Sequence, residues 1–166
     1  RVSRGLGDVY KRQDMDRIAS FSVDHRKIKP CVYISRIDGD ITTYDMRMRK
    51  PNTGDLLSNS ALHSLEHMFA TLIRNSEISG DVIYFGPMGC QTGFYLLIRN
   101  ADNQQVIDII KETLRNIIIY DGEMPGASEI ECGNYRNLDM NLAKVEAEKY
   151  LEAIKDIGVD DLVYET

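Results

Sequence analysis

Two histidines with a glutamate between them are the clearest chemical feature of this chain. His63 and His67 lie four positions apart, and Glu66 comes directly before the second histidine, in the order H-x-x-E-H. On a helix with about 3.6 residues per turn, this spacing puts both imidazoles on one face. Two nitrogen donors on one face supply half of a tetrahedral metal site, and a site with an open position makes the ion a Lewis acid. The spacing therefore predicts metal chemistry on a helix.

The third metal ligand has to come from another segment, and the cysteines are the first candidates. Cys31 opens an apolar run, so we expect it to be a small buried hydrophobic residue. Cys90 lies in a turn rich in Gly and Pro between two strand-like runs, where a thiol can approach a ligand, and we predict that it is reactive. Cys132 follows a long irregular loop and precedes a glycine that permits a tight backbone at a ligand. Cys132 is therefore the candidate third ligand.

The composition favours a small cytoplasmic enzyme. A chain of 166 residues is long enough to bury a core, and we expect one domain. Three cysteines, no signal-peptide core and no run long enough to span a bilayer favour a reduced protein in the cytoplasm. The formal net charge of −6, without a basic stripe, argues against nucleic-acid binding, and nothing favours a membrane partner.

The first residues differ from the rest of the sequence. Residues 1–14 have no hydrophobic periodicity and no initiating methionine, and they end just before Met15. We expect residues 1–14 to be a non-native or disordered leader, and residues 15–166 to form a single catalytic domain.

The elements that position the candidate residues follow from the hydrophobic periodicity. The turn Asp38-Gly39-Asp40 predicts a hairpin. Ser58, Asn59 and Ser60 are candidates for the N-cap of one helix, and another helical pattern follows Asp102. Strands are predicted over residues 31–37, 41–49, 82–85 and 94–99, and helices over 63–75, 106–118 and 142–157. The predicted fold is α+β: an antiparallel sheet with helices packed on one face, in a single domain that carries the H-x-x-E-H metal-binding helix.

Five segments together resemble the S-ribosylhomocysteine lyase family, whose members make the precursor of the autoinducer-2 signal. The segments are residues 20–25, 41–47, 63–75, 87–95 and 132–133, which occur in the family's order. The resemblance implies an enzyme that cleaves the thioether of S-ribosylhomocysteine by carbonyl migration and β-elimination. Its products would be homocysteine and 4,5-dihydroxy-2,3-pentanedione.

The same resemblance implies roles for particular residues. It implies His63, His67 and Cys132 as the metal ligands, and Cys90 and Glu66 as the acid and base. The implied substrate contacts are Ser20, Phe21, His25, Arg47 and Arg74. It also implies one Fe²⁺ per subunit, with Zn²⁺ or Co²⁺ as substitutes, and a homodimer in which the segment around Ser20 reaches into the partner's site.

The chain departs from the family pattern at one position. Six residues before the catalytic cysteine, the family often has an aspartate that holds the amino group of the homocysteine part, and this chain has Tyr84. A tyrosine hydroxyl accepts a hydrogen bond from an ammonium group, but it lacks the formal charge of a carboxylate.

Two other classes of protein share parts of the pattern. The H-x-x-E-H order also occurs in inverted zinc peptidases, in which Glu66 would activate water and Glu146 or Glu148 would be the third ligand. Peptidases of this type have larger chains, however, and the Cys90 turn would have no function in them. A non-catalytic structural site of the Cys-His-His type would need a fourth protein ligand and a closed shell, and no fourth candidate stands out.

Overall fold

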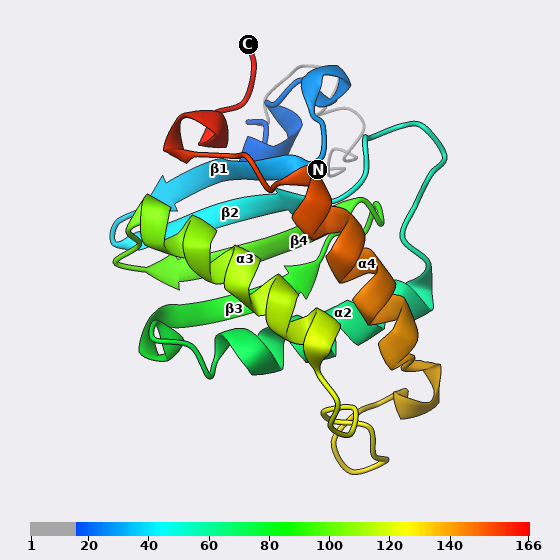
Figure 1. The fold of residues 1–166 in the computed structure, drawn as a ribbon. Coiled ribbons are helices and arrows are strands. Elements are labelled where there is room, and N and C mark those ends of the chain that lie inside the picture. The colour runs from blue at the N-terminus through cyan, green and yellow to red at the C-terminus, as the bar shows by residue number, and fades with distance from the viewer. Residues whose placement is uncertain (1–15) are drawn as a thin grey trace, which may run out of the picture.

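The computed structural model describes residues 16–166, and within them four strands form one antiparallel sheet in the order β1-β2-β4-β3. The prediction for residues 1–14 lies outside the described residues. The strands are β1 (Cys31–Asp38), β2 (Ile41–Arg47), β3 (Val82–Pro87) and β4 (Gly93–Arg99). The helices α2 (Asn59–Ile73), α3 (Asn103–Ile119) and α4 (Met140–Ala153) gather on one side of the sheet (Figure 1). The predicted α+β class with an antiparallel sheet is confirmed.

Short polar residues set the ends of several elements. The hairpin between β1 and β2 is confirmed: Asp38 pairs with Ile41, and Gly39 has a φ of +60°, which glycine adopts without steric cost. The Ser58 side chain caps α2 by accepting a hydrogen bond from the Ala61 N–H at 3.1 Å. Asp102 caps α3 in the same way. Because these caps bind N–H groups that have no partner within the helix, they fix where each helix begins.

The predicted end of the last helix is wrong. Helix α4 ends at Ala153, and a short 3-10 helix, Val159–Leu162, follows. Ile154 is fully buried, and Ile157 packs against both core clusters described below. The apolar pattern therefore continues past the helix because these side chains remain in contact with the core, although the backbone has already turned.

The two faces of the sheet have different surroundings. Alternate residues of a strand point to opposite faces, so Tyr44 and Met46 of β2 face the helices, where they join the main core cluster. Asp45 and Arg47 must then lie on the opposite face. Both are almost fully buried there, with 0% and 3% of their surfaces exposed. The strand alternation therefore places a buried ion pair on the face opposite α2, α3 and α4.

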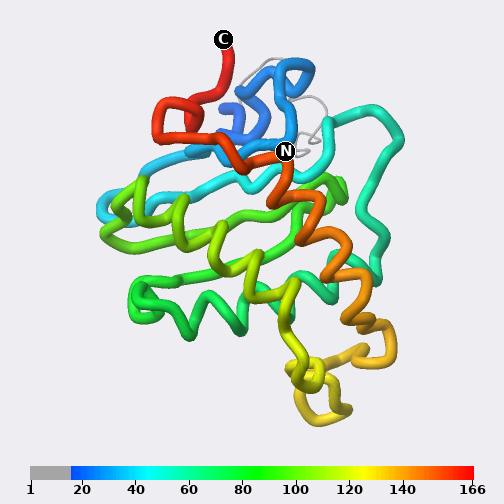
Figure 2. Tube along the Cα trace, in the orientation of Figure 1, coloured from blue at the N-terminus to red at the C-terminus, as the bar shows by residue number. Residues whose placement is uncertain are grey.

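The beginning and the end of the described chain meet on that opposite face. A second, smaller cluster contains Ile28, Cys31 and Tyr33, with Val23 and Tyr164 packed against it. Figure 2 shows the blue segment before β1 beside the red segment at the C-terminus. Segments from the two ends of the sequence thus cover β1. Within residues 16–166, no helix is both long and apolar enough to cross a membrane.

Candidate metal centre and active site

Helix α2 places His63, Glu66 and His67 at the edge of its buried face. Leu65 and Phe69 on the same helix are 2% and 1% exposed, whereas the two histidines and Glu66 are only partly buried. The imidazole rings lie edge to face, with centroids 4.7 Å apart and an interplanar angle of 88°. The spacing argument is confirmed, because one helix turn brings the two rings side by side.

Cys132 joins the two histidines from a distant part of the chain. Its Sγ lies 3.3 Å from Nε2 of His63, and the donor atoms of His63, His67 and Cys132 all lie within 4.8 Å of one another. A tetrahedral ion with typical metal–sulfur and metal–nitrogen bonds separates two such donors by about 3.5 Å. The three side chains therefore fit a single ion with one thiolate and two imidazole ligands.

Each histidine is held through its other ring nitrogen. Nδ1 of His63 lies 2.7 Å from Oδ1 of Asn137, and Nδ1 of His67 lies 2.8 Å from the carbonyl oxygen of Pro125. A carbonyl oxygen only accepts, so Nδ1 donates in both cases and Nε2 keeps its lone pair. Such bonds fix the tautomer and the ring orientation that a metal ligand needs.

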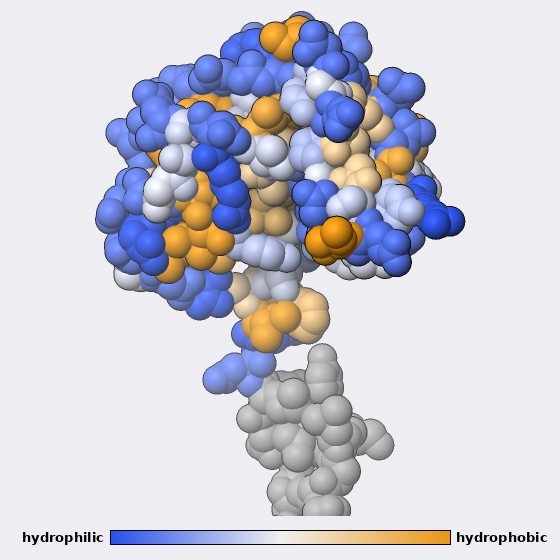
Figure 3. All heavy atoms as spheres, turned by 90° about the horizontal axis from the view of Figure 1, so that it is seen from below, coloured by the Kyte–Doolittle hydropathy of each residue, from blue (hydrophilic) through white to orange (hydrophobic). Residues whose placement is uncertain are grey.

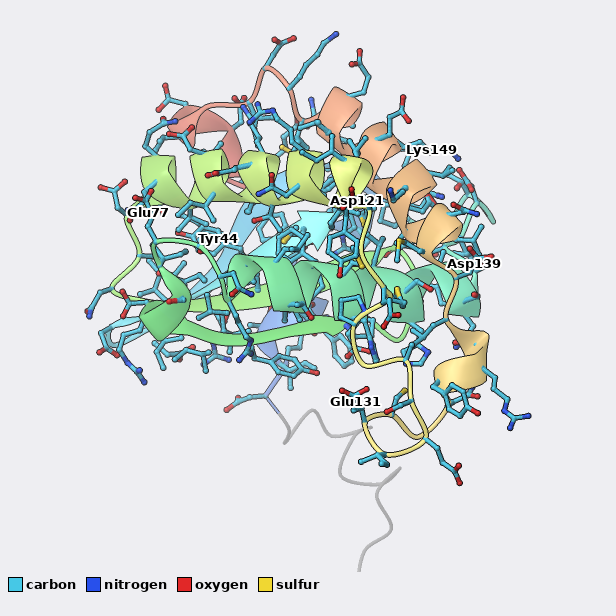
Figure 4. The ribbon with its side chains drawn as sticks, turned by 60° about the horizontal axis from the view of Figure 1, so that its bottom comes forward. Tyr44, Glu77, Asp121, Glu131, Asp139 and Lys149 are labelled. Atoms are coloured by element: carbon cyan, nitrogen blue, oxygen red, sulfur yellow. The ribbon has the colours of Figure 1, made fainter. Side chains whose placement is uncertain are left out.

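The loop between α3 and α4 places Pro125 and Asn137 beside α2. Figure 4 shows the loop passing from Asp121 by way of Glu131 to Asp139, across the end of α2. Asn137 accepts a hydrogen bond through its carbonyl oxygen from the Ser60 hydroxyl at 2.5 Å, and the Asp139 N–H donates to Ser64 at 2.7 Å. The loop is therefore attached to α2 on the C-terminal side of Cys132.

A glycine brings the same loop close to His67. Gly126 has a φ of +69°, and a Cβ at this position would lie 2.8 Å from Nδ1 of His67. A side chain there would be strained by the backbone conformation and would also collide with the imidazole. Gly126 thus permits the close approach that lets Pro125 orient His67.

His63, one of the three candidate metal ligands, lines a cavity of about 620 Å³. Glu66 and His63 line the cavity together with both neighbours of Cys90, Gly89 and Gln91. The remaining lining residues are Asn59, Leu62, Pro87, Met88, Asn134 and Asn137. The structure therefore brings the predicted acid/base residue Glu66 and the Cys90 turn to one cavity.

Cys90 is exposed and has a defined neighbour. Its Sγ lies 3.0 Å from Oγ1 of Thr92, and that oxygen also accepts a hydrogen bond from Nη1 of Arg47 at 3.0 Å. Cys31, in contrast, is 3% exposed, and burial raises the pKa of its thiol, so it remains protonated and inert. The expectation that Cys31 is a buried hydrophobic residue is confirmed.

The predicted substrate contacts are divided between different places. Ser20, His25 and Arg47 line a second, small pocket of about 10 Å³ on the sheet face opposite α2, α3 and α4. Phe21 is 65% exposed, and Arg74 is exposed at the C-cap of α2. Among the described residues, neither Phe21 nor Arg74 lines either pocket. The single chain thus brings together three of these five residues.

Tyr84 lies on β3, an edge strand of the sheet, and is 52% exposed. Its ring lies over Gly86, because a Cβ at Gly86 would be 2.1 Å from the Tyr84 hydroxyl oxygen. Pro87, which follows Gly86, lines the same cavity as His63. Tyr84 is therefore directed along its strand towards the cavity.

Several polar residues that support the site were not predicted from the sequence. Asn137 orients His63, Thr92 contacts Cys90, and Asp45 and Tyr164 lie beside Arg47. Thr92 stands two positions after Cys90, so its proximity was a usable signal. No sequence signal marked Asn137, because its contact with His63 spans 74 positions.

The peptidase alternative fails at its third ligand. Glu146 receives two hydrogen bonds from Nη2 of Arg49, at 2.8 and 2.5 Å, and is only 7% exposed. Among the described residues, the group that could hold an ion contains His63, His67 and Cys132 and neither Glu146 nor Glu148. A buried carboxylate paired with an arginine serves the packing of α4 and does not complete a peptidase site.

Comparison with known proteins gives one consistent result. The model of the family S-Ribosylhomocysteinase (LuxS) matches residues 18–160. A protein of Borreliella afzelii named S-ribosylhomocysteine lyase is 42% identical over 156 residues, which cover 90% of this chain and 99% of the relative. Proteins of the same name from Finegoldia magna and Phocaeicola vulgatus are each 41% identical, over 90% and 92% of this chain respectively and 99% of each relative.

The match covers almost all of the described residues, including the α2 histidines, the Cys90 turn and Cys132. Relatives at this identity share a fold and the order of their elements. The chain belongs to the S-ribosylhomocysteinase (LuxS) family.

Proposed function

We propose that this chain is a metal-dependent S-ribosylhomocysteine lyase. It would convert S-ribosylhomocysteine to homocysteine and 4,5-dihydroxy-2,3-pentanedione, the precursor of the autoinducer-2 signal. The observation that carries the proposal is the convergence of His63, His67 and Cys132 beside a cavity that Glu66 also lines. Family membership supports the same activity.

We infer that His63, His67 and Cys132 hold one divalent ion per chain. A thiolate and two neutral imidazoles suit Fe²⁺, with Zn²⁺ or Co²⁺ as substitutes. Three protein donors leave a coordination position open, as catalytic sites require and closed structural sites do not. When bound, the ion would polarise a sugar carbonyl and stabilise the negative charge that develops on its oxygen.

The reaction needs groups that move protons between neighbouring atoms. A thiolate leaves an alkyl carbon poorly unless a carbonyl two carbons away allows β-elimination. The opened sugar has its carbonyl at C1, whereas the sulfur is on C5. The carbonyl must therefore move to C2 and then to C3, after which loss of the C4 proton expels homocysteine as a thiolate. No electrons are gained or lost in these steps.

Cys90 and Glu66 are the residues to which we assign these proton transfers. As a thiolate, Cys90 would remove and return the protons on the sugar carbons. Glu66 would move protons among the sugar oxygens and remove the C4 proton in the elimination. Both assignments agree with the cavity, where Glu66 lines one part and the neighbours of Cys90 line another.

The remaining part of the substrate needs polar contacts. We propose Ser20, Phe21, His25, Arg47 and Arg74 as these contacts, in a homodimer whose sites lie at the subunit interface. The large exposed fraction of Phe21 agrees with a partner, because a single chain leaves this ring in water. We further propose that the enzyme acts in the cytoplasm, where its cysteines stay reduced.

The activity can be tested by the release of a thiol. Protein loaded with Fe²⁺ under anaerobic conditions is incubated with S-ribosylhomocysteine, and free thiol is titrated against time. We expect thiol to increase until it matches the substrate added. A Cys90→Ala variant with a normal metal content is the matched control, because it keeps the ligands and lacks the proposed base.

Two results would contradict the proposal. One is thiol that never exceeds the background of the protein's own cysteines in metal-loaded enzyme. The other is equal thiol release by the Cys90→Ala variant, which would show that the reaction does not depend on this side chain. Cleavage of unstructured peptides by the same preparation would favour the peptidase alternative instead.

A further inference from the structure

A buried ion pair on the sheet face opposite α2, α3 and α4 is linked to Cys90 through Thr92. Nε of Arg47 donates to Oδ1 of Asp45 at 3.0 Å, and Nη2 donates to Oδ2 at 2.6 Å, so that the guanidinium and the carboxylate meet with two parallel bonds. Both side chains are at most 3% exposed. A buried pair of this kind is costly to desolvate, and its orientation is well defined.

The C-terminal segment supplies a third bond to the same carboxylate. The Tyr164 hydroxyl donates to Oδ2 of Asp45 at 2.6 Å, across 119 positions of sequence. The Tyr164 ring stacks on Tyr33 with centroids 4.6 Å apart and an interplanar angle of 19°. Burial and the negative charge of Asp45 raise the pKa of Tyr164, so its hydroxyl keeps its proton at neutral pH.

The hydrogen bond between Arg47 and Thr92 has only one possible direction. Arginine has no acceptor atom, so Nη1 of Arg47 must donate to Oγ1 of Thr92, 3.0 Å away. The single hydroxyl proton of Thr92 is then free to point at Sγ of Cys90, also 3.0 Å away. A sulfur that receives a hydrogen bond is favoured as the thiolate.

We propose that Tyr164 is a positioning residue for catalysis, which acts on Cys90 through Asp45, Arg47 and Thr92. The network runs from Tyr164 to Asp45, from Arg47 to both Asp45 and Thr92, and from Thr92 to Cys90. Tyr164 does not touch the reacting atoms. This inference rests on the proposed role of Cys90 as a base.

Loss of the Tyr164 hydroxyl has a predictable direction. The Tyr164 hydroxyl stabilises the negative charge of Asp45 through a hydrogen bond. Without this bond, the carboxylate interacts more strongly with the guanidinium of Arg47. The positive charge of Arg47 then polarises the Thr92 hydroxyl less strongly. The Asp45 carboxylate also loses one of the hydrogen bonds that fix its orientation. Both changes disfavour the thiolate of Cys90 and leave the metal ligands untouched.

The test measures the reactivity of Cys90 independently of the lyase reaction. Tyr164→Phe keeps the ring stacked on Tyr33 and removes the hydroxyl. Metal-loaded wild type and variant are alkylated with iodoacetamide from pH 6 to 10, and the label on the Cys90 peptide is measured by mass spectrometry. In the variant at neutral pH, we expect alkylation about two- to tenfold slower, the usual effect of one hydrogen bond. At high pH the two rates should converge.

Tyr33→Phe is the matched control. It removes a hydroxyl from the other ring of the stack, where the oxygen forms its hydrogen bonds with the backbone of Lys29 and none with Asp45. We expect its alkylation profile to match the wild type. The titratable groups that lie near Asp45, Arg47 and Cys90 are the following: His25, Cys31, Tyr33, Tyr95, Tyr150 and Tyr164. Apart from the substituted tyrosine, these groups are common to the wild type and both variants, so they do not cause differences between the profiles.

Thr92 gives a second, independent test. Thr92→Val removes the hydroxyl that connects Arg47 to Cys90, whereas Thr92→Ser keeps it. We expect Thr92→Val to slow the alkylation of Cys90 at least as much as Tyr164→Phe does. Thr92→Ser should have the same alkylation profile as the wild type. Lyase turnover should fall in the same order, with little change in the Michaelis constant.

The outcomes separate this inference from the proposed function. Identical Cys90 profiles for wild type, Tyr164→Phe and Tyr33→Phe would overturn the positioning role, whether or not the protein is a lyase. Equal slowing by Tyr164→Phe and Tyr33→Phe would also overturn it, since disturbed packing would then be the cause. A wild type with no lyase activity would count against the proposed function. The alkylation rates would still test whether Tyr164 affects the reactivity of Cys90.

Discussion

Cys132 and Cys90 carry the same functional group in different surroundings. Cys132 lies among imidazole nitrogens, with its Sγ 3.3 Å from His63 and 3.4 Å from the N–H of Asn134. We expect Cys132→Ala to lose bound metal together with activity, because only two protein ligands remain. The measurement is metal per chain after gel filtration. Full metal content in this variant would exclude Cys132 as a ligand.

The opposite pattern is expected for Cys90. Its contact is Thr92 and not a histidine, so Cys90→Ala should keep the metal and the substrate-binding contacts. Turnover should fall by about 10² to 10⁴, which is the usual contribution of a general base. Metal analysis and single-turnover kinetics on the same preparation test this. Loss of metal from Cys90→Ala would mean that the two cysteine roles are reversed.

Tyr84 stands where the family often has an aspartate. If the hydroxyl binds the ammonium group of the substrate, Tyr84→Asp should lower the Michaelis constant with little change in turnover, because this contact is remote from the bonds that change. Tyr84→Phe, which removes only the hydroxyl, should raise the Michaelis constant. Steady-state kinetics of both variants provide the test, and unchanged constants would assign the ammonium to another group.

At the scale of residues, sequence analysis identified side chains with chemistry of their own and missed those that support them. The spacing of His63 and His67 is sufficient to predict that they lie together, because a helix fixes their relation. Asn137 and Tyr164 act through contacts across 74 and 119 positions. Such contacts depend on how whole elements pack, and no local spacing encodes them.

Among the connecting elements, the loop between α3 and α4 depends on a glycine. Gly126→Ala should push His67 away from Pro125, since the added Cβ would lie 2.8 Å from Nδ1. We expect metal affinity to fall by about 10- to 100-fold, as for other losses of groups that orient a ligand. Competition with a metal chelator measures this affinity.

Gly54→Ala is the matched control for backbone strain. Gly54 also has a positive φ, of +82°, but a Cβ there would meet nothing within 4 Å. Its alanine variant should lose about 1 kcal/mol of stability and keep its metal affinity. Equal metal affinity in both variants would show that the contact with His67 is unimportant.

Local chemistry also determined which elements could be predicted. Asp38-Gly39-Asp40 defined a hairpin, and Ser58 was among three candidates for a helix N-cap, because turn and cap preferences act within a few residues. Helix α2 begins at Asn59, four residues before the predicted start. The end of α4 was placed too late, since Ile154 and Ile157 continue the apolar pattern. The pairing of β2 with β4 was not predicted either. Residues 48–92 lie between these two strands, and a connection of this length leaves the strand order open.

For the whole molecule, we predict a homodimer. Ile18 and Phe21, in the segment before β1, are 58% and 65% exposed, and Figure 3 shows hydrophobic surface among hydrophilic side chains on the face seen from below. A partner chain would remove such surface from water. Sedimentation at micromolar concentration should give twice the mass of the chain. Phe21→Ser should weaken the dimer, whereas a monomer with full activity would contradict the prediction.

The contact between Cys132 and His63 also affects the stability and the lifetime of the folded protein. The two residues are 69 positions apart in sequence, and their donor atoms are 3.3 Å apart. An ion that binds both connects distant parts of the chain much as a covalent cross-link does, and closing a loop of this length removes about 4 kcal/mol of unfolded-chain entropy. The melting temperature should therefore rise with the concentration of free metal. Metal supply would then govern the lifetime of the protein against proteolysis as well as its rate of turnover.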